Sequence, residues 1–390
     1  MKLKPYHIWL FLFGLIYYLI LPAFVIASRI WKDYPGIDSL YSYYKDEYLL
    51  GYFILVSIIA IPFFLGAYLP YYYYREKPSP VNQIIISSRG LFIITLPVLL
   101  YGQYVIWTNR SYMFQGYIIN IEAPFIGTIA TINMIFLFVF LYNKIGEYSS
   151  KTDKILTIIL LELCVVSLGL GTRMYALVTL FSIIIYLLDK QAVTLKKMIF
   201  WLSLIIVFLL AVGIWRMGGT NITYEQMIYI GVAEPTFTWI SAISMYDLNE
   251  LPLIAFPGNF ISSFINFIPS SVLPDKGELI SELSLNYYSP FGATSVFLSL
   301  ISNFGILGSM LALFCLGFLL TQIRLRWRTV FGQSYYYCVC GIIPFQLFRD
   351  DMGIVNKQII SNLLLVPIMF FTVHRIMSLL ATRIDKAPTS

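Results

Sequence analysis

Three arginines are the residues of this chain best suited to bind a charged substrate. Arg173 follows the turn GLGT, Arg216 closes a long apolar run, and Arg349 lies in the sequence FRDDMG. An arginine side chain carries a planar fork of N–H donors that binds two phosphate oxygens at once. Three such side chains at helix ends on one side of a membrane would suit a lipid diphosphate at the depth of the headgroups.

Each arginine could also have a purely structural role, and the functional and the structural interpretation both stay open. Residues 155–188 must supply two membrane crossings with only about 51 Å of helix, so we expect Arg173 to lie slightly below the outer surface, where an ionisable group is costly. It could instead reach a headgroup or pair with a carboxylate. Arg216 stands beside Trp215 and could be an interfacial anchor, and Arg349 could pair with Asp350.

Glu234 is the candidate general base. Transfer of a group to a hydroxyl needs a residue that accepts the hydroxyl proton, and histidine is the usual one. The only histidines are His7 and His374, and neither falls on a segment that we expect on the extracytoplasmic side of the membrane. The carboxylate in GVAEPTF, between two apolar patches, is therefore the best candidate, although it could be a solvated loop acid or the first charge of a helix starting near Pro235. With two histidines and four cysteines inside apolar runs, the sequence indicates no metal site.

The composition predicts an all-α polytopic membrane protein. Of 390 residues, 59% are hydrophobic and 12% are charged, whereas roughly 25% are charged in soluble domains. No charged block is long enough for a separate soluble catalytic domain. The net charge of +6 reflects basic residues at cytoplasmic helix ends, so we expect membrane lipids as partners and no nucleic acid.

The hydropathy pattern predicts about ten transmembrane helices and one large loop. A span needs about 20 apolar residues, and we place spans near 8–30, 48–70, 90–107, 118–142, 155–170, 174–188, 198–215, 292–320, 333–348 and 356–376. The chain thus divides into helices one to seven (1–215), an extracytoplasmic loop (216–291), and helices eight to ten with the C-terminus (292–390). The first apolar run is longer than that of a signal peptide and is expected to be an uncleaved span.

Charge asymmetry orients these spans. Most lysines and arginines fall on one set of connections and most acidic residues on the other, which places both termini in the cytoplasm. The apolar run 251–271 contains three prolines and is not counted as a span; short amphipathic helices at the outer surface, broken at Pro235 and Pro257, are expected in the loop. Glu162 lies inside a span, where we expect it to be a buried partner of an arginine.

Three local sequences resemble the oligosaccharide repeat-unit polymerases, the O-antigen polymerase (Wzy) family. They are Gly171-Thr172-Arg173 at the start of a span, PFGATSVFLSLISNFGILG at 290–308, and the acid in Ala233-Glu234-Pro235. The ten-span plan with a large late loop is similar as well. In residues, the resemblance covers about 40 positions.

The resemblance implies a metal-independent glycosyltransferase of the GT-C type, without a cofactor, in the bacterial inner membrane. Its substrate would be an undecaprenyl-diphosphate-linked oligosaccharide, polymerised at the periplasmic face into O-antigen-type polysaccharide of lipopolysaccharide. Arg173, Arg216 and Arg349 would hold the diphosphate, with Arg173 and Arg216 stabilising it as it leaves. Glu234 would activate the acceptor hydroxyl. A polysaccharide chain-length regulator is a further candidate partner.

Other membrane proteins of this kind are alternatives. An O-antigen ligase is similar in plan, but that family typically has a histidine in the outer loop, where this chain has none. A lipid-linked oligosaccharide flippase would show internal repeats and charged span interiors, and neither is evident. A membrane acyltransferase would usually carry a histidine or arginine motif in its first span, which residues 8–20 lack.

Overall fold

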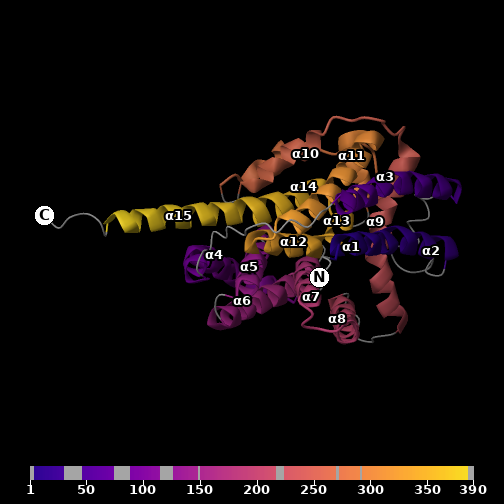
Figure 1. The fold of residues 1–390 in the computed structure, drawn as a ribbon. Coiled ribbons are helices and arrows are strands. Elements are labelled where there is room, and N and C mark those ends of the chain that lie inside the picture. The colour runs from indigo at the N-terminus through magenta and orange to yellow at the C-terminus, as the bar shows by residue number, and fades with distance from the viewer. Residues whose placement is uncertain are drawn as a thin grey trace.

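The computed structural model describes residues 4–29, 46–73, 88–114, 126–147, 150–216, 224–268, 272–289 and 292–384. Regular secondary structure in these ranges is helical (Figure 1). The longer elements are α1 (Tyr6–Leu15), α2 (Leu21–Ser28), α3 (Asp46–Tyr73), α4 (Ser88–Asn109), α5 (Ile126–Gly146), α6 (Ser150–Gly169), α7 (Arg173–Asp189), α8 (Leu195–Arg216), α9 (Tyr224–Leu248), α11 (Val296–Arg326), α12 (Val330–Ile342) and α15 (Val366–Ile384). The shorter ones are η1 (Ile16–Ile20), η3 (Arg110–Tyr112), α10 (Gly258–Ser262), η4 (Ser263–Phe267), η5 (Pro274–Leu279), α13 (Gln346–Arg349), α14 (Met352–Asn356) and η7 (Lys357–Leu365).

The protein is a polytopic α-helical membrane protein. Seven helices in the described ranges are long and apolar enough to cross a bilayer: Tyr6–Ser28, Glu47–Tyr73, Gly90–Tyr112, Gly127–Gly146, Lys196–Ile214, Val296–Arg326 and Met352–Leu380. The three other predicted spans correspond to α6, α7 and α12. Two of them are shorter than the seven spanning helices, since α7 has 17 residues and α12 has 13. Helix α6 has 20 residues but is more charged, because it carries Lys151, Asp153, Lys154 and Glu162.

The expected continuous span at 333–348 is interrupted. Helix α12 ends at Ile342, and α13 begins only at Gln346. Pro344 lies between them, and a proline lacks the N–H that would continue the ladder of helical hydrogen bonds. The interruption matters for the site because α13 is the short helix that ends in Arg349.

The tightest helix pair in the core is α3 with α11. A β-carbon on Gly66 would lie 2.1 Å from the carbonyl oxygen of Phe314, and one on Gly317 would lie 2.2 Å from that of Phe63. Small residues let two backbones approach this closely, which is how helices commonly pack within membranes. Helix α12 packs on α5 and α7 in the same core, and its Tyr336 and Tyr337 are fully buried.

The segment after α9 lies over α11. The described part of the predicted non-spanning run, residues 251–268, contains no helix long enough to span a membrane. Within it the structure describes only α10, which starts directly after Pro257, and η4. Gly305 has a φ of +70° and breaks α11, so that the N–H groups of Ile306 and Leu307 donate to the carbonyls of Pro252 and Leu253. Figure 1 shows α10 outside α11. The NFG sequence at 303–305 is thus a docking point for the loop.

The predicted break at Pro235 is wrong, because Pro235 lies inside α9, a single helix of 25 residues. A proline inside a helix leaves the carbonyl four residues earlier without its usual donor. Here that carbonyl belongs to Gly231, and it accepts a hydrogen bond from the hydroxyl of Tyr17 at 2.6 Å. The neighbouring carbonyl of Val232 accepts from the hydroxyl of Thr236. The Tyr17 hydroxyl therefore replaces the missing N–H and allows the helix to continue.

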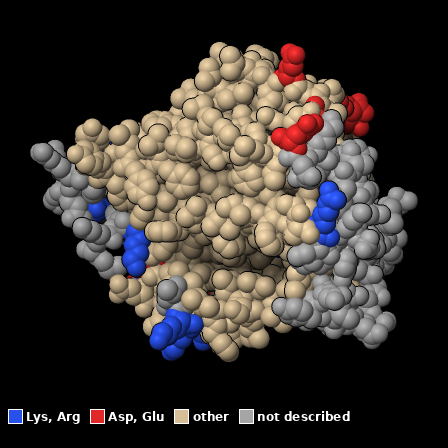
Figure 2. Space-filling view, turned by 90° about the vertical axis from the view of Figure 1, so that its right-hand side faces the viewer, with Lys and Arg blue, Asp and Glu red and all other residues tan. Residues whose placement is uncertain are grey.

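One end of the molecule, where α2 lies in Figure 1, is shown from outside in Figure 2. Its surface is hollowed near the centre, and acidic side chains gather in one corner.

Candidate functional site

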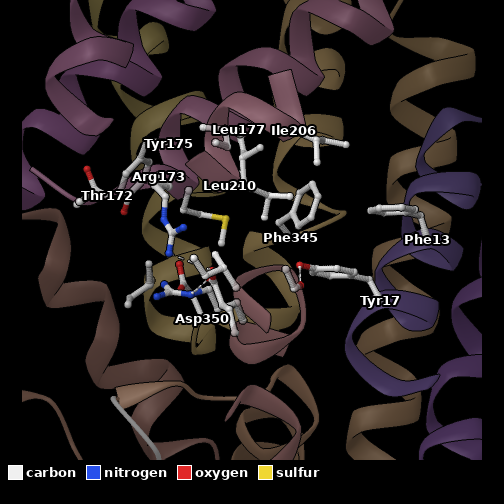
Figure 3. Close-up of a pocket in the computed structure, with 18 of the residues that line it drawn as sticks. Phe13, Tyr17, Thr172, Arg173, Tyr175, Leu177, Ile206, Leu210, Phe345 and Asp350 are labelled. Atoms are coloured by element: carbon white, nitrogen blue, oxygen red, sulfur yellow. Dashed lines mark hydrogen bonds and ion pairs between the residues drawn. The ribbon is translucent and has the colours of Figure 1, made fainter. Parts of the chain in front are cut away.

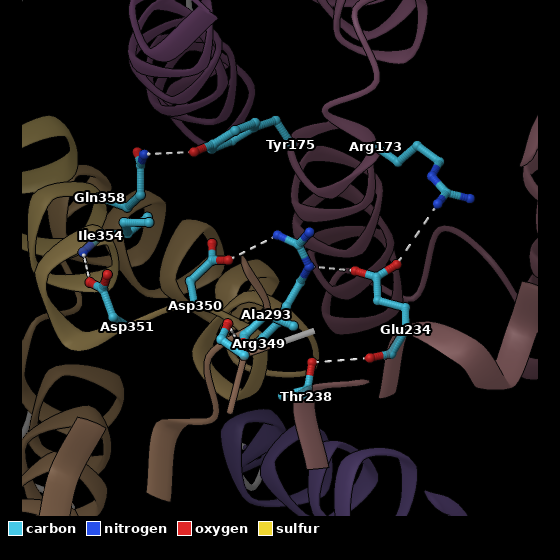
Figure 4. A network of polar contacts seen from close by, with 11 residues as sticks. Arg173, Tyr175, Glu234, Thr238, Ala293, Arg349, Asp350, Asp351, Ile354 and Gln358 are labelled. Carbon is cyan, nitrogen blue, oxygen red and sulfur yellow. Dashed lines mark hydrogen bonds and ion pairs between the residues drawn. The ribbon is translucent and has the colours of Figure 1, made fainter. Parts of the chain in front are cut away.

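Arg173, Glu234 and Arg349 meet in the structure, although 176 residues separate the first from the last in the sequence. The Nε atom of Arg349 lies 2.5 Å from Oε1 of Glu234, and Nη2 of Arg173 lies 4.0 Å from Oε2 of the same carboxylate. The Nε contact is an ion pair and not an aligned hydrogen bond. Figure 4 shows the Glu234 carboxylate between the two guanidinium groups. The structure therefore joins three of the four predicted site residues.

Each of the three side chains is placed by a different element. Arg173 is the first residue of α7, Arg349 is the last residue of α13, and Glu234 lies in the middle of α9. Gly213 on α8 leaves room for the first arginine, because a β-carbon there would lie 2.9 Å from its Nη1 atom. The helix-end positions of the two arginines match the prediction, whereas Glu234 belongs to a helix and not to a loop.

The side chain of Arg216, the fourth predicted residue, lies outside what the structure describes. Its backbone ends α8, about one turn beyond Gly213. The end of α8 at Arg216 is therefore the end that faces Arg173. Its predicted contact with a diphosphate stays a prediction.

Arg349 is held between two carboxylates. Its Nη1 atom donates to Oδ1 of Asp350 at 3.0 Å, while its Nε atom faces Glu234. Burial alone would lower the pKa of Arg349, but the Glu234 and Asp350 carboxylates outweigh it and raise that pKa. Burial raises the pKa of Asp350 above its ordinary value, although the neighbouring guanidinium works in the opposite direction. The arginine is thus a fixed cation, and Asp350, 10% exposed, is its buried partner.

The backbone around Arg349 is fixed as well. The N–H of Thr294, in the segment that enters α11, donates to the carbonyl of Arg349 at 3.3 Å. The side chain of Asp351 accepts from the N–H of Ile354 at 2.8 Å and caps α14. The two aspartates of FRDDMG therefore have different roles, one paired with the arginine and one starting the next helix.

The two arginines and the glutamate line a cavity of about 450 Å³. Its other wall is apolar and aromatic, and Figure 3 shows Phe13, Tyr17, Leu210 and Phe345 facing the charged groups from the far side. The lining residues come from η1 and the helices α1, α5, α7, α8, α9 and α14, together with the turn before α7 and the segment 345–350. The cavity thus has two arginines and two carboxylates at one end and an apolar wall at the other.

Glu162 has a different partner from the one predicted. It accepts a hydrogen bond from the side chain of Gln103 on α4 at 2.9 Å, and no arginine of the described residues pairs with it. An amide is a neutral donor that satisfies a carboxylate without a second charge. Glu162 is not among the residues that line the cavity described above.

Two residues of the site were not predicted. Tyr17 lines the cavity and reaches α9 from the first span, but in the sequence it is one of 30 tyrosines. Tyr17 is distinguished from the others by its position next to the proline-containing turn of α9 in the folded protein, and no local sequence pattern reveals this position. Asp350 was named only as a local partner of Arg349; its contribution to the cavity wall depends on the interruption at Pro344.

In the described ranges, no three His, Cys, Asp or Glu side chains are grouped as metal ligands would be. Comparisons with family models, with curated proteins and with solved structures find no match for this chain.

Proposed function

We propose that this protein is a glycosyltransferase that polymerises undecaprenyl-diphosphate-linked oligosaccharide repeat units into O-antigen-type polysaccharide. The observation that carries the proposal is the convergence of Arg173 and Arg349, from two separate helices, at the polar end of an otherwise apolar cavity. Fixed guanidinium groups bind phosphate oxygens in pairs. The apolar wall is suited to the first part of an isoprenoid chain.

The proposed reaction is a substitution at an anomeric carbon. An acceptor hydroxyl oxygen bonds to that carbon, the bond from the carbon to the diphosphate oxygen breaks, and the diphosphate leaves with the electron pair. Arg173 and Arg349 stabilise the charge that develops on the leaving group. The hydroxyl proton passes to the carboxylate of Glu234, which lies between the two arginines.

The arrangement gives Glu234 a second task. Without substrate, its carboxylate occupies the place beside Arg349 that a phosphate oxygen would take. A bound diphosphate must displace it, and the displaced carboxylate is then free to accept a proton. Substrate binding and activation of the base are coupled in this proposal.

The finer architecture belongs to the same proposal. Ten spans of the GT-C type, with both termini in the cytoplasm of a bacterium, would place Arg173, Arg216 and Arg349 at the periplasmic face of the inner membrane. The lipid-linked unit is built in the cytoplasm in such a scheme, so a flippase must deliver it. A chain-length regulator is a candidate partner.

A complementation experiment tests the proposal. The gene is expressed in a strain that lacks its own repeat-unit polymerase and whose repeat unit this enzyme accepts, and the surface glycan is separated by gel electrophoresis. We expect a ladder of long chains. Glycan limited to single repeat units would contradict the proposal, and transfer of preformed chains to lipid A–core without elongation would favour the ligase alternative.

A further inference from the structure

Pro235 creates a weak point in α9 next to Glu234. The ring nitrogen of Pro235 has no hydrogen, so the carbonyl of Gly231 lacks the donor that closes a helical turn. In a bilayer, a carbonyl without a donor costs several kcal/mol, and nearby side chains usually supply a replacement. A helix without such a replacement is expected to bend or shift at the proline.

Tyr17 supplies the replacement from another helix. Its hydroxyl donates to the carbonyl oxygen of Gly231 at 2.6 Å, across 214 residues of sequence. The ring is held by neighbours on both sides: it stacks on Phe13 at 5° and meets Phe345 edge to face at 5.6 Å. Figure 3 shows Tyr17 reaching across the cavity from the first span.

The first span is adapted to present this side chain. Residues Ile16–Ile20, which include Tyr17, form a π-helical turn within the otherwise regular helix. Such turns change the direction of the side chains that they carry, and they occur frequently at functional sites. Tyr18, the next residue, stacks on Phe348, the residue directly before Arg349. The π-helical turn thus touches α9 and α13, two of the three helices that supply charged groups to the cavity.

The hydrogen bond bears on Glu234 because Gly231 and Glu234 are three residues apart in α9. Residues with this spacing lie on the same face of a helix, and both line the cavity. The next carbonyls along this helix, of Val232 and Glu234, accept from Thr236 and Thr238. These two bonds lie within α9, whereas the bond from Tyr17 ties α9 to another helix.

We propose that Tyr17 is a positioning residue: its hydroxyl locks α9 at Pro235 and thereby holds the Glu234 carboxylate against Arg349 and Arg173. Any catalytic consequence of this lock rests on the proposed function. The lock itself is a property of the fold, and it can be measured without turnover.

The test is a cycle of variants of the full-length protein in lipid nanodiscs, with inorganic pyrophosphate as the probe in isothermal titration calorimetry. In Tyr17→Phe the freed Glu234 competes less well for the arginines, so pyrophosphate should bind about three- to tenfold tighter, the range that one hydrogen bond allows. Pro235→Ala restores an N–H at position 235 that donates to the carbonyl of Gly231. In that background Tyr17→Phe should change the affinity less than about twofold. In a Glu234→Gln background it should also have little effect.

Tyr104→Phe is the matched control, because Tyr104 is 60% exposed on α4. It should leave the pyrophosphate affinity unchanged. An unchanged or weaker affinity in Tyr17→Phe would overturn the proposal, and so would an equal gain in the Pro235→Ala background. The melting temperature of each variant shows that it is folded. None of these measurements requires glycan synthesis. A result that refutes the role of Tyr17 can therefore be distinguished from one that refutes the proposed polymerase activity.

Discussion

Replacing Glu234 with glutamine should make the arginine site bind a diphosphate more tightly. The carboxylate lies 2.5 Å from Arg349 and 4.0 Å from Arg173, so it competes with any incoming anion for both cations. The amide of Glu234→Gln keeps the size of the side chain and removes the charge. The arginines gain no new contact in this variant; they lose a competitor.

The magnitude follows from the geometry. Two unit charges 4 Å apart interact with about 4 kcal/mol at an effective dielectric constant of about 20. Glu234 and Arg349 are 35% and 37% exposed, however, and fully exposed pairs contribute only about 0.2–1 kcal/mol. An intermediate cost of about 1.4 kcal/mol for displacing the carboxylate corresponds to a tenfold gain in affinity.

Titration calorimetry with inorganic pyrophosphate, on the purified protein in nanodiscs, measures this gain. Glu250→Gln is the matched control, since it makes the same change of charge at an exposed position. We expect about tenfold tighter binding for Glu234→Gln and little change for Glu250→Gln. Equal effects of the two variants, or weaker binding to Glu234→Gln, would refute the view that this carboxylate occupies a phosphate site.

Three further predictions concern the site and the topology. Arg173→Ala and Arg349→Lys should each reduce glycan chain length and weaken pyrophosphate binding by about tenfold or more; in the second variant the reason is that a lysine cannot bridge two partners as an arginine does. Arg216→Ala should also shorten the glycan. Normal glycan from all of these variants, at normal membrane levels, would remove the site assignment. Burial raises the pKa of Asp350 above its ordinary value, so the wild-type protein should lose stability as the pH rises from that ordinary value through the raised one. The melting temperature of Asp350→Asn relative to wild type should therefore increase between about pH 4 and pH 7, and a decrease would contradict this. A cysteine at Ser262 should react with a membrane-impermeant maleimide added from the periplasm; reaction only from the cytoplasm would overturn the predicted topology.

Composition and hydropathy were sufficient for the helical membrane class and for most helix positions. The apolar runs near residues 48–70 and 292–320 correspond to α3 and α11. Prolines were harder to interpret, because the effect of a proline depends on which donor can replace its missing N–H. Pro344 interrupts a helix, whereas Pro235 does not, since Tyr17 lies within reach of the freed carbonyl. No local pattern around either proline contains this information.

The candidate site was predicted in its residue types but not in its pairing. Arginines at helix ends can be recognised from the turn before Arg173 and from the position of Arg349 after an apolar run. That Glu234 bridges the two depends on the rotation of α9, which packs on α2, α3 and α8. Single-sequence reasoning cannot supply that rotation. The partner of Glu162 was missed for the same reason, since nothing in the sequence around Gln103 indicates which helix its side chain faces.

The most direct test of the central claim is synthesis by the purified protein. The full-length chain is reconstituted in liposomes with an undecaprenyl-diphosphate-linked repeat unit that it accepts, and the products are analysed by mass spectrometry. The proposal predicts a series of glycans that increase by one repeat unit, with one undecaprenyl diphosphate released for each unit added, and loss of the series in Arg349→Lys. Unchanged single units without released undecaprenyl diphosphate, from protein that still binds pyrophosphate, would contradict it.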